Sequence, residues 1–410
     1  MPHEAYDDVP SAAERLRQAA QTFVRGLWAQ DVRLDTADAY RSTKSLVLRC
    51  RVTEGGLDAP PTIIVKHARP RAEYPLGHVR NLVNDWSACH LLNRVPGDPP
   101  LAPQLLGGDL DAGLLVLEDL GYGEGSDLHE VLHGDDPEAA REALREHAAL
   151  LGRLHGATVG RADEYDRFRA TLAPEEPPTP LFTDPWPRVR RFRSHAREVE
   201  EVSRHYQSVL LGLGVRPHAD VESEIAHVTR AVEEEPGPFL AFCKGDQNGV
   251  SDLIRRNGKP RLFDFDCGGF RHALLEGMPG RVTWGGMQRL PPDLLPCLDR
   301  TYQASLAHYL PAAADDRVFG RAMVEAGARW HVFHVLRRLP DALQADRMRG
   351  PSTLRQQVLA WTNAFADLSD GNGHLSGLGE SARELATRLR ALWPPEAREL
   401  PWFPAFVPGS

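Results

Sequence analysis

Two apolar segments, each ending in a carboxylate motif, constrain the fold of this sequence more than any other feature. The first ends in Gly-Asp at Asp246, and the second, residues 261–266, ends in Asp-Phe-Asp. Asn257-Gly258 lies between them and predicts a tight hairpin turn, which would return Asp264 to the neighbourhood of Asp246. Carboxylates at the ends of buried strands lose solvation, so they require a metal, a proton-transfer role or a paired cation.

This pair of carboxylates suits phosphoryl transfer, in which one carboxylate orients a hydroxyl nucleophile and the other holds Mg²⁺ on a nucleotide. Each carboxylate also has a simpler interpretation. Asp246 follows Gly245 and could be a turn residue. Asp264 lies between two phenylalanines and could occupy the solvated face of a strand. The two segments alone leave these alternatives open.

The length and charge of the chain limit the classes of protein to which it can belong. A chain of 410 residues is too long for one small core, so two lobes or domains are expected. Hydrophobic content of 42% and charged content of 26% are ordinary for a globular protein. The net charge of −9 argues against non-specific nucleic-acid binding and is compatible with a cationic or neutral substrate.

The cysteines and the N-terminus indicate the compartment. The five cysteines are scattered, odd in number and without CxxC spacing. This argues against a structural zinc site or a disulfide framework and favours a reducing cytoplasm. The N-terminus lacks the basic and apolar regions of a signal peptide, and no apolar run approaches 18 residues, so no membrane span is expected.

Apolar periodicity in the first third of the chain predicts a helix, two strands, a second helix and a third strand. Their ranges are 10–29, 46–52, 62–66, 78–94 and 114–118. Asp85 lies at the edge of the apolar stripe of the second helix. A carboxylate there either has a partner or is a solvated edge position, and the pattern leaves both open.

The rest of the chain is predicted to be mostly helical. Glycines after Asp119 indicate a hinge over 119–121. Helices are then expected over 137–158, 190–213, 219–234, 291–310, 316–338, 352–367 and 379–392. The proline-rich stretch 166–190 is expected to be a loop, since proline interrupts helices.

The sequence therefore predicts an α+β fold with two lobes. The expected parts are a helical extension over 1–34, a strand-rich N-lobe over 35–118, the hinge over 119–121, a helical C-lobe with the hairpin over 122–392, and an irregular tail over 393–410.

In this order, the motifs resemble the aminoglycoside phosphotransferase and choline kinase-like family, which has the protein-kinase-like fold. The resemblance covers about residues 35–340. Ile64-Val-Lys66 resembles the family's lysine strand, Asn84–Cys89 the helix facing that strand, and Leu117–Leu120 the hinge. Leu151–His155 resembles the long helix after the hinge, Lys244-Gly-Asp246 the catalytic loop, and Phe263–Asp266 the metal-binding segment.

The resemblance implies ATP-dependent transfer of a phosphoryl group to a hydroxyl of a small molecule, such as an aminoglycoside, amino sugar, sugar or amino alcohol. Asp246 would accept the proton of that hydroxyl. Lys66, held by Asp85, would bind the nucleotide phosphates, and Asp264 would hold Mg²⁺. Further nucleotide contacts are implied for Glu118 and Leu120 in the hinge and for Ser42 and Thr43 in a serine-rich loop.

The chain departs from the family pattern at several positions. Lys244 replaces the usual histidine of the catalytic loop, and Asp85 replaces the usual glutamate. Ser251 stands where the family places a metal-binding asparagine, although Asn248 and Asp252 lie close by. The loop over 41–45 is not a GxxxxGK[ST] motif, which disfavours a P-loop NTPase.

Two other functions stay open from the sequence. A kinase-like binding protein with little or no catalysis is favoured by Lys244 and Ser251, and opposed by the joint presence of Lys66, Asp246 and Asp264. An Mg²⁺-dependent hydrolase would use the same carboxylates but leaves the N-lobe lysine unexplained.

Three further positions are open to interpretation from the sequence. His155 is predicted to be a packed, hydrogen-bonded residue. Asp266 could bind a ligand or cap the following segment, and Arg271-His272 could line the substrate site or support it.

Overall fold

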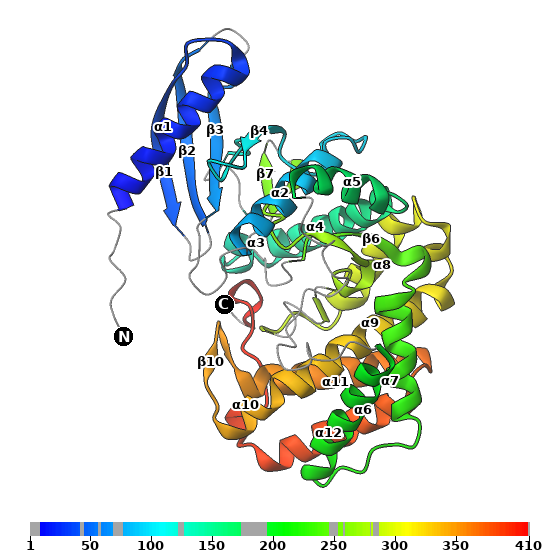
Figure 1. The fold of residues 1–410 in the computed structure, drawn as a ribbon. Coiled ribbons are helices and arrows are strands. Elements are labelled where there is room, and N and C mark those ends of the chain that lie inside the picture. Colours follow the sequence, from blue (N-terminus) through cyan, green and yellow to red (C-terminus); the bar gives the residue numbers. More distant parts are fainter. Residues whose placement is uncertain are drawn as a thin grey trace.

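The computed structural model describes residues 9–41, 45–55, 59–68, 77–121, 127–173, 195–245, 253–256, 259–278, 280–281 and 287–408. The fold is α+β, as predicted. A strand-rich N-lobe extends to Glu118, and a larger helical C-lobe follows it (Figure 1).

The N-lobe is built on a five-stranded antiparallel sheet with the order β1-β2-β3-β5-β4. The strands are β1 (Arg33–Arg41), β2 (Ser45–Glu54), β3 (Thr62–Ala68), β4 (Leu105–Asp109) and β5 (Leu114–Glu118). Two helices, α1 (Val9–Trp28) and α2 (Gly77–Leu92), pack against the sheet.

The alternation of side chains along β3 determines what each helix contacts. Ile63 and Val65 are fully buried in the cluster formed with α1. Ile64 packs into the other cluster, which contains the apolar residues of α2. Lys66 shares the face of Ile64, so β3 directs this lysine towards α2.

Two strands of this sheet were not predicted. Leu34 is the one buried side chain of β1, an edge strand, so its sequence shows no apolar alternation. β4 contains Gly107 and Gly108, which contribute no apolar side chain. Both strands are held by backbone pairing with β2 and β5, which leaves little signal in the sequence.

The C-lobe contains the predicted helices, with small shifts at their ends. Its long helices are α4 (Pro137–Thr158), α6 (His195–Gly212), α7 (Val221–Thr229), α8 (Leu294–Ala307), α9 (Asp316–Arg337), α11 (Leu354–Asn372) and α12 (Ser376–Leu392). α7 continues as one π-helical turn, Arg230–Glu234. Among the described residues, no helix is long and apolar enough to cross a bilayer.

The prediction of a loop over 166–190 is wrong for the first residues of this range. Helix α5 (Ala162–Leu172) extends into it, because the prolines begin only at Pro174. Tyr165 and Arg169, four residues apart, form the buried face of this helix. Residues 174–194 lie outside the described part of the chain.

A hairpin is present where it was predicted, but its strands differ from the expectation, and its turn residues 257–258 lie outside the described residues. β7 (Leu253–Arg256) pairs with β8 (Lys259–Leu262) on either side of Asn257-Gly258. The strand that leads to Gly245, β6 (Leu240–Cys243), pairs instead with β9 (Gly269–His272). Phe263–Phe265 follow β8 outside any strand, so Asp264 is not a strand residue.

The C-terminal segment 393–408 has little regular structure, as expected, but it is packed against the C-lobe. Phe403 and Phe406 are buried in the main core. The backbone N–H of Arg289 donates to Pro401 O (2.7 Å), and the N–H of Phe403 donates to Arg289 O (3.2 Å). The segment is therefore part of the C-lobe.

Candidate active site

Lys66 lies at the centre of a charged cluster between the two lobes. Its Nζ donates to Asp85 Oδ2 of α2 (2.6 Å) and also to a carboxylate oxygen of Asp264, in the segment after β8. Asp85 is 1% exposed, and Lys66 is 14% exposed. The predicted contact between Lys66 and Asp85 is therefore present, and the structure adds Asp264 to it.

The second oxygen of Asp85 explains why this carboxylate is tolerated at a buried position. Asp85 Oδ1 accepts a hydrogen bond from the N–H of Phe265 (3.0 Å). Both oxygens of Asp85 are thus bonded, one to a cation and one to the backbone. Of the two interpretations that the sequence left open, the structure supports the partnered one.

The electrostatics of the cluster keep Lys66 charged. Burial opposes the charged form, but the attraction of Asp85, Asp264 and Asp266 outweighs it and raises the pKa of Lys66 well above its usual value. The ammonium is a fixed positive charge at neutral pH.

Asp264 has an unusual backbone conformation, with φ of 62°. Left-handed conformations are uncommon outside glycine, although aspartate tolerates them better than most residues. The bond from Phe265 N–H to Asp85 and the full burial of Phe265 hold this conformation in place. The Asp264 side chain is 39% exposed, so it faces solvent on one side. Such local strain is common at functional sites.

Two asparagines of α2 hold the next part of the same segment. Asn84 Nδ2 donates to Asp266 O (3.0 Å), and Asn81 Nδ2 lies 3.3 Å from Asp266 Oδ2. Arg169 of α5 donates to Asn84 Oδ1 (3.2 Å). Asp266, left open by the sequence, is buried and tied to α2. Asn81 and Asn84 were missed, although their spacing of three residues beside Asp85 places all three on one helix face.

The hinge residues have structural partners. Glu118 accepts hydrogen bonds from Arg261 Nη1 of β8 (2.6 Å) and from the backbone N–H of Gln104 (3.0 Å). Leu120 is buried. Asp119 accepts from Arg49 Nε (2.6 Å) and from Gly121 N–H (2.8 Å), which forms a tight turn. The nucleotide contacts assigned to Glu118 and Leu120 stay predictions.

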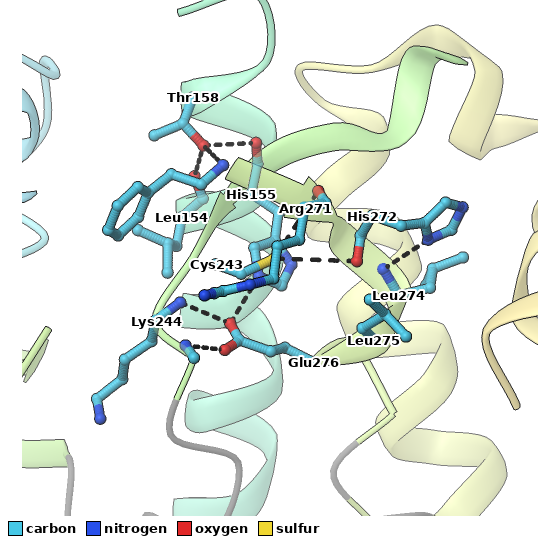
Figure 2. Close-up of polar contacts among 12 residues, drawn as sticks. Leu154, His155, Thr158, Cys243, Lys244, Arg271, His272, Leu274, Leu275 and Glu276 are labelled. Atoms are coloured by element: carbon cyan, nitrogen blue, oxygen red, sulfur yellow. Dashed lines mark hydrogen bonds and ion pairs between the residues drawn. The ribbon is translucent and has the colours of Figure 1, made fainter. Parts of the chain in front are cut away.

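A buried glutamate holds the base of the loop that leads to Asp246. Glu276 accepts from the backbone N–H of Lys244 (2.8 Å) and from that of Gly245 (Figure 2). Gly245 has φ of 87°, and a Cβ there would lie 1.9 Å from Cys267 O, so this position requires glycine. Because Glu276 binds the backbone of Lys244, this contact does not depend on the side chain that departs from the family pattern.

Glu276 is supported in turn by α4 and α8. His155 of α4 lies 3.3 Å from Glu276 Oε2 through Nε2 and 2.7 Å from the hydroxyl of Tyr302 through Nδ1. Burial raises the pKa of Glu276, but the hydrogen bonds from His155 and Gly245 outweigh it, so the net shift is downward. The prediction of His155 as a packed, hydrogen-bonded residue is confirmed. Glu276 itself was missed, because it lies far along the chain from the loop that it holds.

Arg271 and His272 also have structural contacts. Arg271 Nη2 donates to Cys267 O (2.8 Å), and His272 Nδ1 accepts from Leu274 N–H (3.3 Å). Burial lowers the pKa of His272 to about 4, so this imidazole is neutral. These contacts support the structural interpretation of both residues.

Several predicted site residues lie outside the described part of the chain. They are Asp246, Ser251, Ser42 and Thr43, with the alternatives Asn248 and Asp252. The described structure reaches Gly245 on one side and Arg41 and Ser45 on either side of the serine-rich loop. The roles of these residues stay predictions.

Comparison with known proteins gives structural neighbours of low sequence identity. No family model and no curated protein matches the chain. A choline/ethanolamine kinase family protein from Mesorhizobium loti is 13% identical, with a TM-score of 0.39 over 91% of this chain and 99% of that one. An ethanolamine kinase from Plasmodium vivax is 9% identical, with a TM-score of 0.41 over 89% and 96% of the two chains.

A thermostable mutant of aminoglycoside phosphotransferase APH(4)-Ia is 11% identical, with a TM-score of 0.37 over 86% of this chain and 99% of that one. The structural neighbours of the chain are small-molecule kinases of the choline/ethanolamine and aminoglycoside groups, the family that its motifs resemble.

Proposed function

We propose that the protein transfers a phosphoryl group from ATP to a hydroxyl of a small molecule. The observation that carries this proposal is the position of Lys66, whose ammonium is held by the buried Asp85 and contacts the partly exposed Asp264. Three far-separated segments thus bring one fixed cation and one accessible carboxylate together. Phosphoryl transfer needs these two groups for phosphate binding and for metal binding.

Lys66 and Asp85 would act as a unit. The raised pKa of Lys66 keeps its ammonium charged, and Asp85 holds it in one position. A fixed ammonium binds phosphate oxygens through charge-assisted hydrogen bonds. Asp85 would therefore act through Lys66 and would not touch the nucleotide itself.

The donor atoms of the cluster fit Mg²⁺. This ion prefers oxygen ligands and is commonly held by one or two carboxylates together with substrate phosphates. Asp264 offers a carboxylate with an exposed side, and we propose that it holds the ion, with Ser251 as a further oxygen ligand. Bound Mg²⁺ would neutralise negative charge on the phosphates.

Asp246 is proposed as the residue that orients the acceptor hydroxyl and takes its proton. It follows Gly245 directly, and Glu276 binds the N–H of Gly245. The base of the loop is thus fixed to the C-lobe core, which would keep the catalytic carboxylate in position. The acceptor class extends from aminoglycosides and amino sugars to sugars and amino alcohols, and the net charge of −9 is compatible with a cationic one.

Nucleotide binding and turnover, each with and without Mg²⁺, test the proposal. Asp264→Asn should abolish Mg²⁺-dependent ATP binding, whereas Asp246→Ala should retain binding and lose transfer. Asp111→Asn, at a surface turn after β4, is the matched carboxylate control and should behave like the wild type. Wild-type protein that shows no Mg²⁺-dependent binding at millimolar ATP would refute the proposal. Binding without transfer to any acceptor of these classes would favour the non-catalytic alternative.

A further inference from the structure

A second cluster of polar side chains lies in the C-lobe, on elements that do not contribute to the Lys66 cluster. It consists of His227 on α7, Glu325 on α9 and His374 between α11 and α12. His227 Nε2 lies 2.7 Å from Glu325 Oε1, and His374 Nε2 lies 3.1 Å from the same oxygen. The two imidazole rings are nearly perpendicular, at 89°. Two nitrogens thus converge on one carboxylate oxygen.

The backbone holds His374 in this position. Helix α11 ends at Gly373, which has the left-handed conformation with φ of 57°. The N–H of His374 then donates to Ser369 O (3.3 Å), and the hydroxyl of Ser369 donates to His374 O (2.8 Å). This is a Schellman-type helix end, which orients the residue after the glycine.

A second contact fixes His227 relative to His374. Glu224, three residues before His227 on α7, accepts hydrogen bonds from the N–H groups of Gly377 (3.1 Å) and Leu378 (2.6 Å) at the start of α12. α7 also packs directly on α9 and α12, and Figure 1 shows these helices together in the C-lobe. The packing of these helices therefore holds the three side chains close to one another.

The charge and exposure of the cluster suit a cation. Glu325 is 15% exposed, and His374 is 22% exposed. His227 is 45% exposed, so the cluster is open to water on its side.

We propose that His227, Glu325 and His374 form a binding site for a divalent transition-metal ion of the Zn²⁺ class. Two imidazole nitrogens and one carboxylate oxygen suit such ions, whereas Mg²⁺ and Ca²⁺ prefer oxygen ligands alone. The three ligand atoms lie within 4.8 Å of one another. In a tetrahedral zinc site they would be about 3.3 Å apart, given metal–ligand distances near 2 Å. The observed separations of 2.7 and 3.1 Å require only a small outward shift.

The proposed site would have three protein ligands and one water, and the bound ion would stabilise the C-lobe. Each imidazole would bind through Nε2 and carry its proton on Nδ1, and water would occupy the fourth position on the exposed side of His227. The ion would join α7, α9 and the α11–α12 corner. Because it binds the folded chain, it should raise the melting temperature increasingly as its free concentration rises above the dissociation constant.

Titration of the full chain with Co²⁺ tests the site, because tetrahedral Co²⁺ has visible absorption bands that report its ligands. The protein is first stripped with a chelator, and Zn²⁺ is then used to displace the Co²⁺. We expect saturable binding of one ion with a tetrahedral spectrum, its loss on adding Zn²⁺, and an increase in melting temperature with either ion. The absence of saturable Co²⁺ or Zn²⁺ binding would overturn the proposal.

Four variants locate the ion. Glu325→Gln keeps the shape of the side chain, and His374→Ala removes one imidazole. Each should weaken Co²⁺ binding by about a hundredfold or more, since even the loss of an outer partner costs 10–100-fold. His308→Ala removes an exposed histidine elsewhere in the C-lobe, and Asp111→Asn changes an exposed carboxylate of the N-lobe, so both should bind Co²⁺ like the wild type. Melting curves in chelator confirm that each variant is folded. Unchanged Co²⁺ spectra in both ligand variants would place the ion elsewhere and refute the site.

Discussion

The two lobes bury polar side chains in different ways. The N-lobe pairs its buried charges, Lys66 with Asp85 and Arg49 with Asp119 at the start of the hinge. The C-lobe also buries charges, such as Glu276 and the pair Arg329–Glu233, but in addition it buries imidazoles, and burial lowers the pKa of His147 and His331 to about 3 and that of His272 to about 4. The N-lobe therefore keeps charge where a charged ligand would bind, whereas the C-lobe keeps these side chains neutral within a rigid core.

The difference also predicts opposite responses to pH. The pKa of Lys66 is raised in the folded chain, so its contribution to stability is fully present below its unfolded value of 10.5 and is lost only at higher pH. The histidine pKa values are lowered, so their contributions are present above the unfolded value of 6.5 and are lost as the pH falls towards 4.

The largest expected effect is therefore acid destabilisation through the C-lobe. Between pH 6.5 and 4, the unfolded chain binds protons at His147, His272 and His331 that the folded chain excludes. Each histidine should then remove up to about 1.4 kcal/mol of stability per pH unit. Urea unfolding at pH 7 and pH 5 measures this loss. In His331→Gln the amide can still accept from Tyr206. This variant should remove about one third of the loss of unfolding free energy that the three histidines cause between pH 7 and pH 5. Equal stability at both pH values would contradict this contrast between the lobes.

The next effect tests the ion pair of the N-lobe. Lys66→Met leaves Asp85 buried without its cation, which should cost about 3 kcal/mol of unfolding free energy and abolish ATP binding. In the double variant Lys66→Met/Asp85→Asn, the amide can still accept from Phe265 N–H, so much of the stability should return while ATP binding stays lost. Chemical unfolding and nucleotide titration separate the two effects. A double variant as unstable as the single one would show that the buried charge is not the cause.

A smaller effect is expected for the carboxylate that binds backbone. Glu276→Gln removes the charge that accepts from the N–H groups of Lys244 and Gly245, which should cost about 2 kcal/mol. Because Glu276 positions the loop and not the nucleotide, the turnover number should fall while ATP affinity stays near the wild-type value. Steady-state kinetics and ATP titration provide the comparison with Lys66→Met. Loss of ATP affinity in Glu276→Gln would contradict the expectation that Glu276 positions the loop, whereas Lys66 binds the nucleotide.

The smallest effect is expected for Tyr302, which contacts His155, the residue that supports Glu276. Tyr302→Phe removes the hydroxyl that bonds His155 Nδ1, which should cost about 1 kcal/mol. Turnover should change less than in Glu276→Gln, since His155 still reaches Glu276 through Nε2. A larger loss of turnover than in Glu276→Gln would mean that Tyr302 has a role beyond supporting His155.

Sequence patterns predicted the parts of the fold in which burial is periodic. The helices of the C-lobe and the central strands of the sheet follow this rule. The same pattern placed Asp85 beside an apolar stripe but left open whether it has a partner. The edge strand β1 could not be predicted in the same way, because Leu34 is its one buried side chain. Nor could β4, in which two glycines replace apolar residues.

Within the candidate site, the resemblance in motif order assigned Lys66, Asp85 and Asp264 to one site in advance, but it did not predict the direct contact between Lys66 and Asp264. It did not reveal Glu276, Asn81 or Asn84, because their roles depend on hydrogen bonds to groups that are distant in the sequence. It also did not reveal the left-handed conformation of Asp264, which the tertiary contacts of Phe265 maintain.

The packing of the C-terminal segment has a consequence for how the chain is made. Phe403 and Phe406 belong to the main core, Phe406 lies near Arg141 of α4, and Arg289 pairs with the backbone around Trp402. A ribosome completes α4 and Arg289 long before it reaches these residues. During synthesis the C-lobe therefore exposes the apolar surface that they later cover. A chain stalled before residue 397 would leave this surface exposed, so synthesis of residues 397–406 is needed to complete the core of the lobe.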